Sequence, residues 1–425
     1  MNDMVARPII VKSEHRITPG EKVFLVIALI FTTGGFLNVF LGFDYMPGAG
    51  TGTFGLDILW ASIFAITFIL LRRRGTRFIH EFQKNPMFLL LVGLPFASTL
   101  WSVSPHITFF ASFALLGTAF IALYISLYFT SRELLDLLAW TIGICGACSV
   151  LFVVFIPSLG IGTGDFQGQW QGIYSQKNAL GRMMAIGFVV FLLLFKFVRP
   201  RRLRYLLLAG FMFVLVCLSQ SATSLVVCVA LPIALWGTKL VFVPLRHPIR
   251  RRTTTSLAAI AVVWMASIHL GDILNLLGRD EGLTGRTTLW ALVAGAIVQR
   301  PLLGYGYEAF WRGNGTGGVS DEIWNQFGQF LWFSHNGLLE VLLALGLVGG
   351  VVVVGSFLLL SYKALRALRQ RYAIETMWPV LCLAYLFIVN ITDDYILKFH
   401  SLPTILFLTI VLGMRRDSPL PVRSA

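Results

Sequence analysis

Residues 336–361 have the sequence NGLLEVLLALGLVGGVVVVGSFLLLS, in which Glu340 is the one ionisable residue. A helix needs about 20 mostly apolar residues to cross a bilayer, so this stretch is long enough to do so. Similar stretches recur along the chain of 425 residues, of which 56% are hydrophobic and 13% charged. The mean hydropathy is +0.78. Because soluble domains carry about 25% charged residues, this composition excludes a soluble enzyme, a disordered scaffold and a secreted disulfide domain.

About twelve stretches are apolar enough to be predicted as membrane spans: 23–43, 55–71, 87–103, 107–129, 134–156, 179–198, 205–219, 224–241, 256–270, 336–361, 377–392 and 401–414. Residues 288–298 are apolar but too short to span, so we expect a helix that lies on the outer surface. The sequence therefore predicts an all-α polytopic membrane protein. It has a tail at 1–22, one membrane domain at 23–414 and a second tail at 415–425.

The basic residues predict the orientation of these spans. If the N-terminus is cytoplasmic, 27 of the 34 Lys and Arg residues lie in inner segments, as the positive-inside rule requires. Both termini are then cytoplasmic, and the net charge of +14 needs no nucleic acid as a partner. The seven remaining cations lie in outer segments: Lys177, Arg182, Arg279, Arg286, Arg300, Arg312 and Lys398.

Two predicted outer loops, 157–178 and 271–335, are long, and long loops in compact domains are usually functional or disordered. In and just after the first loop, the aromatic rings of Trp170 and Tyr174 are candidates to stack on sugars, with Asn178 as a hydrogen-bonding partner. Lys177 and Arg182 are candidates to bind an anion. The alternative is an interfacial aromatic belt with a glycine-rich turn, and an arginine that only extends towards the membrane surface.

In the second long loop, Arg286 follows a glycine and precedes the predicted surface helix. A guanidinium binds phosphate or diphosphate through two parallel hydrogen bonds, and free N–H groups at a helix start add to such a site. Arg279 is interpreted as one half of a local ion pair. The turn that contains Tyr305 and Tyr307 shapes a sugar groove or only reverses the chain.

A third cluster lies at the start of the span 336–361. A neutral imidazole at the membrane boundary, as expected for His335, can accept a proton from a hydroxyl. Glu340 lies five residues later, about 140° around a helix, so it is expected to hold the helix bundle or a third group rather than His335. Asp393 and Asp394 end another span on the outside and are candidates to pair with outer arginines.

Cys145-Gly-Ala-Cys148 has the spacing of a redox or metal motif. No second pair completes a zinc set, so packing inside a predicted span is the favoured interpretation. The sequence thus gives no reason to expect a metal or another cofactor.

Several of these motifs together resemble those of a known family. His335-Asn336, followed after nine residues by Gly346-x-x-Gly349, resembles the signature of the O-antigen ligase and Wzy-type polymerase superfamily. Gly285-Arg286, then Pro301-Leu-Leu-Gly-Tyr-Gly306, resembles its large periplasmic loop. Trp101-Ser-Val-Ser-Pro105 and the motif from Gly172 to Gly181 are most similar to its exopolysaccharide-polymerase (ExoQ-like) branch.

The resemblance implies a GT-C-like fold with a ligase/polymerase-like core at about 205–350 and a periplasmic loop at 271–335. It implies a metal-independent glycosyltransferase in the bacterial inner membrane. The implied partners are an undecaprenyl-diphosphate-linked glycan, an acceptor glycan, and chain-length and export proteins. The implied catalytic residues are His335, which activates the acceptor hydroxyl, and Arg286, which holds the diphosphate. Asn336, Glu340, Gly346 and Gly349 would support them.

The sequence departs from the family at one point. Ligases carry a second arginine near the outer end of the span that follows the first long loop, where this chain has Ser219-Gln-Ser-Ala-Thr-Ser224. Either Arg182 or Lys177 supplies that charge, or the diphosphate is held differently. The expected function is a glycan polymerase of exopolysaccharide or O-antigen biosynthesis. The alternatives are an O-antigen ligase, a polar-solute transporter and a scaffold without chemistry.

Overall fold

The structure is a computed structural model that describes residues 17–37, 54–75, 77–164, 167–242, 286–312, 319–327 and 331–414. Among these residues the regular secondary structure is helical, apart from an isolated β-bridge between Ile161 and Trp170. The predicted all-α polytopic fold is therefore confirmed.

Seven helices in the described ranges are long and apolar enough to cross a membrane. They are α3 (Phe54–Arg73), α6 (Pro105–Tyr128), α7 (Ser131–Phe155), α9 (Lys177–Phe197), α10 (Arg202–Ser219), α16 (Gly337–Gln370) and α17 (Ile374–Thr392). Further apolar helices are α1 (Pro19–Thr32), α5 (Pro86–Ala97), α11 (Ala222–Phe242) and α18 (Leu402–Gly413).

These helices overlap eleven of the twelve stretches predicted as spans, and the twelfth, 256–270, lies outside the described residues. The remaining helical segments are short: α4 (Arg77–Lys84), η1 (Ser98–Leu100), α8 (Pro157–Gly160), α14 (Arg286–Gln299), η4 (Phe310–Arg312) and α15 (Val319–Phe327). The helix predicted at 288–298 is present as α14.

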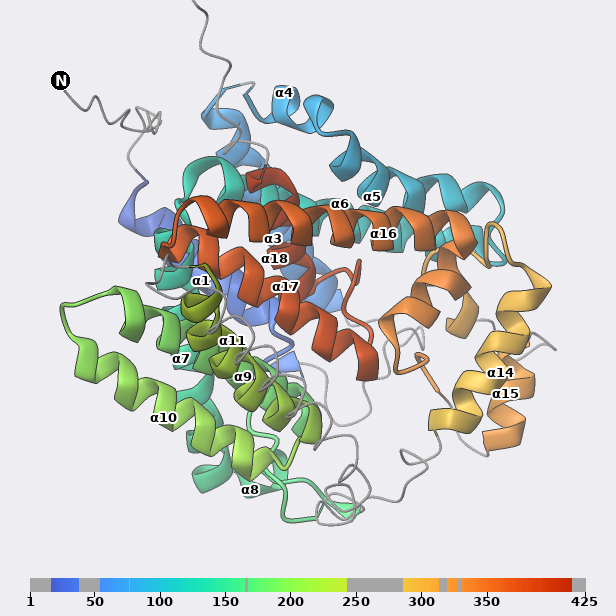
Figure 1. Cartoon of the computed structure of the whole chain (residues 1–425). Helices are drawn as coiled ribbons and strands as arrows, with labels where there is room; N and C mark the ends of the chain where they lie inside the picture. Colours follow the sequence, from blue (N-terminus) through green and yellow to red (C-terminus); the bar gives the residue numbers. More distant parts are fainter. Residues whose placement is uncertain are drawn as a thin grey trace, which may run out of the picture.

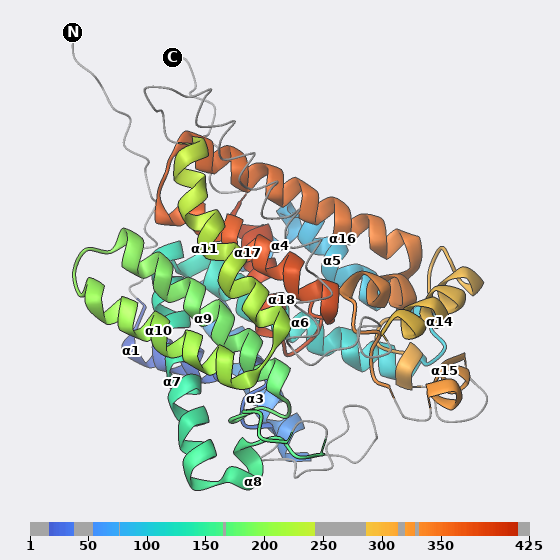
Figure 2. The ribbon, with the colours of Figure 1, turned by 60° about the horizontal axis from the view of Figure 1, so that its bottom comes forward.

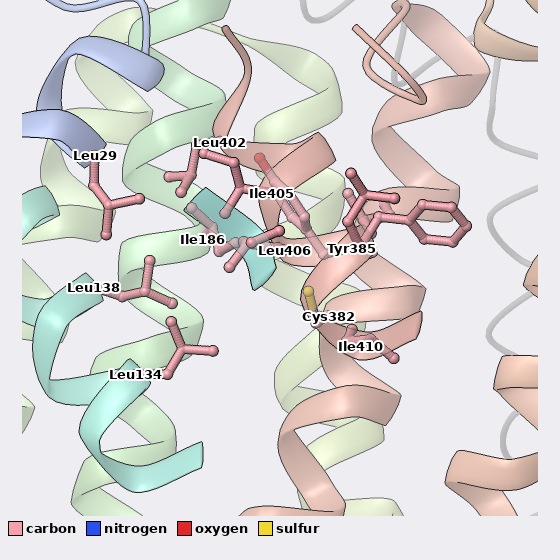
Figure 3. Close-up of a cluster of buried hydrophobic side chains, with 14 of the residues drawn as sticks. Leu29, Leu134, Leu138, Ile186, Cys382, Tyr385, Leu402, Ile405, Leu406 and Ile410 are labelled. Atoms are coloured by element: carbon pink, nitrogen blue, oxygen red, sulfur yellow. The ribbon is translucent and has the colours of Figure 1, made fainter. Parts of the chain in front are cut away.

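Most of the long helices form one bundle, with α14 and α15 at one end of it, beyond the start of α16 (Figures 1 and 2). Helix α9 is the centre of one half and packs against α7, α10, α11 and α17. Buried leucine and isoleucine side chains of α1, α7, α9 and α18 belong to one apolar cluster, to which α17 adds Cys382 and Tyr385 (Figure 3). Peripheral helices expose large apolar side chains such as Leu207, Phe113 and Val351, which suits contact with lipid.

The segments predicted to be outer loops gather at one end of the bundle, although they are far apart in the chain. The backbone N–H of Trp170 donates to the carbonyl of Leu218 (3.2 Å), and the hydroxyls of Thr223 and Thr392 are 2.8 Å apart. The Asn336 amide donates to the carbonyl of Ile391 (3.3 Å). This end of the bundle, called the loop end below, therefore holds the predicted functional segments.

Helix α16 is interrupted at Gly346, where the backbone has φ 61° and ψ −161°. Only glycine adopts this conformation readily. The loop at 301–306 fills the interruption: Tyr305 and Gly306 donate backbone hydrogen bonds to Leu343 and Ala344, and Leu347 donates to Pro301 (2.8–2.9 Å). A Cβ atom at 346 would lie 2.3 Å from the backbone of the loop.

The same loop also binds the corner between α5 and α6. The Trp101 indole donates to the carbonyl of Leu303 (2.8 Å), and the Val103 N–H donates to Tyr305 (2.9 Å). The three separate motifs at 101–105, 301–306 and 335–349 are thus parts of one hydrogen-bonded unit.

Candidate active site

His335 lies in a tight turn directly before α16, at the loop end. Its backbone has φ 54°, an uncommon value for a residue other than glycine. Asn336 caps the helix, because its side-chain oxygen accepts from the N–H groups of Leu338 and Leu339 (3.0 and 3.1 Å). Such caps satisfy N–H groups that have no partner within the helix. The predicted supporting residue Asn336 therefore fixes where α16 begins and where the turn lies.

Glu340 holds the residue next to His335 rather than His335 itself. Its carboxylate accepts from the Ser334 N–H and from the Trp311 indole, both at 2.9 Å. Of the two alternatives left open for Glu340, the helix bundle or a third group, these contacts favour the third group.

Three charged groups act on the His335 imidazole: Asp393, Arg286 and Arg182. Burial, with a smaller effect of the cationic groups of Arg286 and Arg182, lowers the pKa of His335 to about 4 against the opposing effect of the Asp393 carboxylate. The imidazole is therefore neutral at pH 7 and able to accept a proton. The structure brings together His335, Arg286 and Arg182, which are candidates from three separate segments of the sequence.

Arg182 lies inside the bundle, with 3% of its surface exposed, and forms an ion pair with Asp393. Its guanidinium lies 4.8 Å from the centre of the Tyr395 ring, and its backbone carbonyl accepts from the Tyr385 hydroxyl (3.1 Å). The predicted pairing of Asp393 with an outer arginine is thus confirmed. Arg182 does not extend to the membrane surface.

The turn at 219–224, which lacks the arginine of the ligases, packs directly against the start of α9. A Cβ atom at Gly181 would lie 2.6–2.8 Å from side-chain atoms of Ser219, Ser221 and Ser224. Arg182 follows Gly181 in α9, and its guanidinium pairs with Asp393 and lies over the Tyr395 ring. Lys177 lies one turn earlier in α9 and is also buried.

The predicted glycan-binding residues differ in their exposure. Trp170 and Asn178 are half-buried, but the ring of Tyr174 lies inside the bundle, with its hydroxyl 3.5 Å from that of Thr33. Tyr305 and Tyr307 are buried too, and their hydroxyls donate to the carbonyls of Ala296 and Leu397. These three tyrosines pack the loop and the bundle, and their rings are not open to a sugar in this structure.

A second charged cluster lies nearby, and in it Asp394 pairs with Lys398 and not with an arginine. Lys398 contacts Glu308 (3.0 Å) and Asp394 (2.9 Å), and Arg312 lies 3.4 Å from Glu308. Burial raises the pKa of Asp394 to about 8, against the effect of Lys398. The sequence carries only local signals of this cluster. They are two pairs of opposite charge spaced four residues apart, Glu308 with Arg312 and Asp394 with Lys398.

The described residues contain no group of three or more His, Cys, Asp or Glu side chains arranged to hold a metal ion. The five cysteines are free thiols, and Cys145 is buried on α7.

Two comparisons with known proteins show what the chain is similar to. Residues 207–354 match a family described as O-antigen ligase. The chain is also 27% identical over 273 residues to the exopolysaccharide production protein ExoQ of Rhizobium meliloti (strain 1021). This alignment covers 60% of the chain and 59% of that relative, so the chain spans about three fifths of its length. The resemblance predicted from the motifs is therefore confirmed: residues 207–354, a segment that contains Arg286 and His335, match the O-antigen ligase family.

Proposed function

We propose that the chain is a glycan polymerase of exopolysaccharide or O-antigen biosynthesis. It transfers an undecaprenyl-diphosphate-linked oligosaccharide to an acceptor glycan at the periplasmic face of the bacterial inner membrane. One observation carries the proposal: a neutral imidazole, His335, lies within electrostatic reach of Arg286 and Arg182 at the loop end. A glycosyl transfer from a lipid diphosphate needs both a base and cations.

The chemistry follows from these groups. The acceptor hydroxyl oxygen attacks the anomeric carbon of the donor, and its proton passes to the imidazole of His335. The bond between the anomeric carbon and the diphosphate oxygen breaks, and its electron pair remains on the diphosphate. Arg286 stabilises the negative charge that grows there, as preorganised cations do in other transfers. Undecaprenyl diphosphate leaves, and no covalent intermediate with the protein forms.

Donor binding itself strengthens the base. The diphosphate brings negative charge next to Arg286, and an opposite charge close to an imidazole raises its pKa. His335 is a weak base in the free protein, with a pKa of about 4, and becomes a stronger base when the donor is bound. Proton transfer is then favoured only in the complex that is ready to react.

The runner-up is an O-antigen ligase, which would attach the glycan to a lipid or another acceptor. The description of the matching family supports it, whereas the name of the exopolysaccharide relative supports a polymerase. In both cases the protein acts in the inner membrane, its termini are cytoplasmic, and no metal takes part.

The test uses purified full-length protein in lipid nanodiscs with undecaprenyl-diphosphate-linked repeat units. Products with several repeat units on one lipid would support the polymerase. Transfer only to an added lipid acceptor would support the ligase. If neither product forms with either acceptor, and solute uptake occurs in vesicles, the transferase proposal is wrong.

A further inference from the structure

The helix that carries Arg286 is tied to the turn that carries His335 by one side chain. Trp290 lies one turn after Arg286 on α14, and its indole N–H donates to the backbone carbonyl of Ser334 at 3.0 Å. Ser334 directly precedes His335. The two proposed catalytic residues are therefore connected through one short path along α14 and one hydrogen bond.

Ser334 is held from its other side by Glu340. The carboxylate accepts from the Ser334 N–H at 2.9 Å, and the Ser334 hydroxyl donates to the carbonyl of Asn336 at 3.0 Å. The backbone N–H, the backbone carbonyl and the hydroxyl of Ser334 therefore each form a hydrogen bond. This explains how the adjoining His335 is kept at φ 54°, because such a conformation persists where its surroundings determine it.

Glu340 is in turn held by a rigid aromatic group. Its second oxygen accepts from the Trp311 indole at 2.9 Å, and the Trp311 ring stands edge-on to Phe310 at 4.9 Å between ring centres. Phe310 makes the same kind of contact with Tyr305, also at 4.9 Å. The carboxylate is thus fixed by Trp311 of η4, whose ring packs against Phe310.

We propose that Glu340 and Trp290 are positioning residues that act through Ser334 and set the place of the His335 imidazole relative to Arg286. This inference rests on the proposed function for its kinetic consequences only. Both side chains contact Ser334 and come from different helices. Glu340 of α16 accepts from its N–H, and Trp290 of α14 donates to its carbonyl. A carboxylate that only stabilised the bundle could bind any neighbouring helix, whereas Glu340 binds the residue directly before the proposed base.

The variants Glu340→Gln and Trp290→Phe test the proposal. The Ser334 N–H and the Trp311 indole contact different oxygens of Glu340, and Gln replaces one of these oxygens with an NH2 donor, so one of the two hydrogen bonds is lost. Phe keeps an aromatic ring but lacks the indole N–H. Since a displacement of about 1 Å at a reacting group costs on the order of 100-fold in rate, we expect kcat to fall by about that factor, with the donor KM little changed.

Trp101→Phe is the matched control. It removes an indole N–H that also donates to a loop carbonyl, that of Leu303, but does not contact Ser334. We expect near wild-type kcat. A double-mutant cycle adds a second control: the effects of Glu340→Gln and Trp290→Phe should not be additive, because both act on Ser334, whereas Glu340→Gln and Trp101→Phe should be additive.

The acid side of the pH profile distinguishes positioning from loss of folded protein. The charges that face His335 are Asp393, Arg286 and Arg182, and neither variant changes them. A loosened turn admits water to the imidazole, so the pH at which activity falls should rise towards the unperturbed value of about 6.5. A variant that merely reduced the amount of folded enzyme would leave that pH where it is.

A readout that needs no activity separates this inference from the proposed function. Diethyl pyrocarbonate modifies accessible neutral imidazoles, and mass spectrometry can follow His335 alone. We expect faster modification of His335 in Glu340→Gln and Trp290→Phe than in the wild type and Trp101→Phe. Faster modification without glycan transfer by the wild type would leave the positioning role intact and remove the proposed function.

Equal modification rates and an unchanged kcat in both variants would overturn the positioning role. If Glu340→Gln does not yield folded protein, Trp290→Phe and Ser334→Ala together decide whether the role stands. Ser334→Ala removes only the hydroxyl bond to Asn336 and should have an intermediate effect.

Discussion

Arg182 and Asp393 form a buried ion pair that joins the start of α9 to the residue directly after α17, although 211 positions separate them in the sequence. The pair lies beside His335, and its two charges have opposite effects on the pKa of that imidazole. A contact that stabilises the loop end is therefore also part of the electrostatic environment of the proposed base.

Breaking this pair should cost stability and change the base. Removing one partner of a buried pair costs about 3–5 kcal/mol, so Asp393→Asn should lower the thermal unfolding midpoint clearly. Asp136→Asn is the control, because its pair with Arg132 is partly exposed and worth about 0–1 kcal/mol. Asp393→Asn should also move the acid limit of activity to lower pH, since the carboxylate raises the pKa of His335. A midpoint no lower than that of the control would contradict a structural role of the pair.

The pH dependence of transfer should differ between free and donor-bound protein. As a base, His335 must be neutral, so activity falls as pH drops through its pKa. The profile of kcat/KM reports the free protein and should fall near pH 4. The profile of kcat reports the complex, where the diphosphate raises the pKa, and should fall at a higher pH. The same limit in both profiles would show that the donor charge does not reach His335.

Lysine should not replace Arg286. Arg286→Ala removes the cation, and Arg286→Lys restores the charge without the planar fork that contacts two phosphate oxygens. We expect both variants to lose most of the activity, measured as polymer yield in a deletion strain. Arg300→Ala is the control, because Arg300 lies just beyond the other end of α14, over the Tyr305 ring. A wild-type polymer yield from Arg286→Lys would contradict the need for the guanidinium and show that a positive charge alone is sufficient at this position.

Gly346→Ala should disrupt the interruption of α16. The new Cβ would lie 2.3 Å from the backbone of Leu302, in a conformation that residues with a Cβ rarely adopt. Overpacking of this kind costs about 1–3 kcal/mol, apart from the backbone strain. Gly355→Ala, on the same helix with open space around it, should be neutral or stabilising. Thermal unfolding of both variants in detergent gives the comparison; equal midpoints would mean that the loop does not depend on the glycine.

The predicted orientation can be checked with single cysteines in a variant that lacks the five native ones. Ser175 is exposed at the loop end, and Gln370 is exposed at the other end of α16. An impermeant maleimide should label Ser175→Cys in intact spheroplasts, and should label Gln370→Cys only after lysis. The reverse pattern would invert the proposed topology.

The sequence alone predicted the apolar helices of the described residues, the helix α14 and the candidates His335 and Arg286. Hydropathy is a property of neighbouring residues, so an apolar run such as 336–361 specifies a membrane helix without knowledge of its partners. The cap at Asn336 is equally local, because it binds N–H groups two and three residues away. The motif from His335 to Gly349 could be recognised for the same reason.

Only the tertiary structure decided what surrounds these residues. It joined Arg182 to Asp393, Glu308 to Lys398 and Trp290 to Ser334, pairs whose members lie 44 to 211 positions apart. It also turned the rings of Tyr174, Tyr305 and Tyr307 into the interior, where the sequence left a sugar groove open as an alternative. Such pairings depend on which helices pack together, and hydropathy carries no information about that choice, because one apolar helix surface can pack against many others.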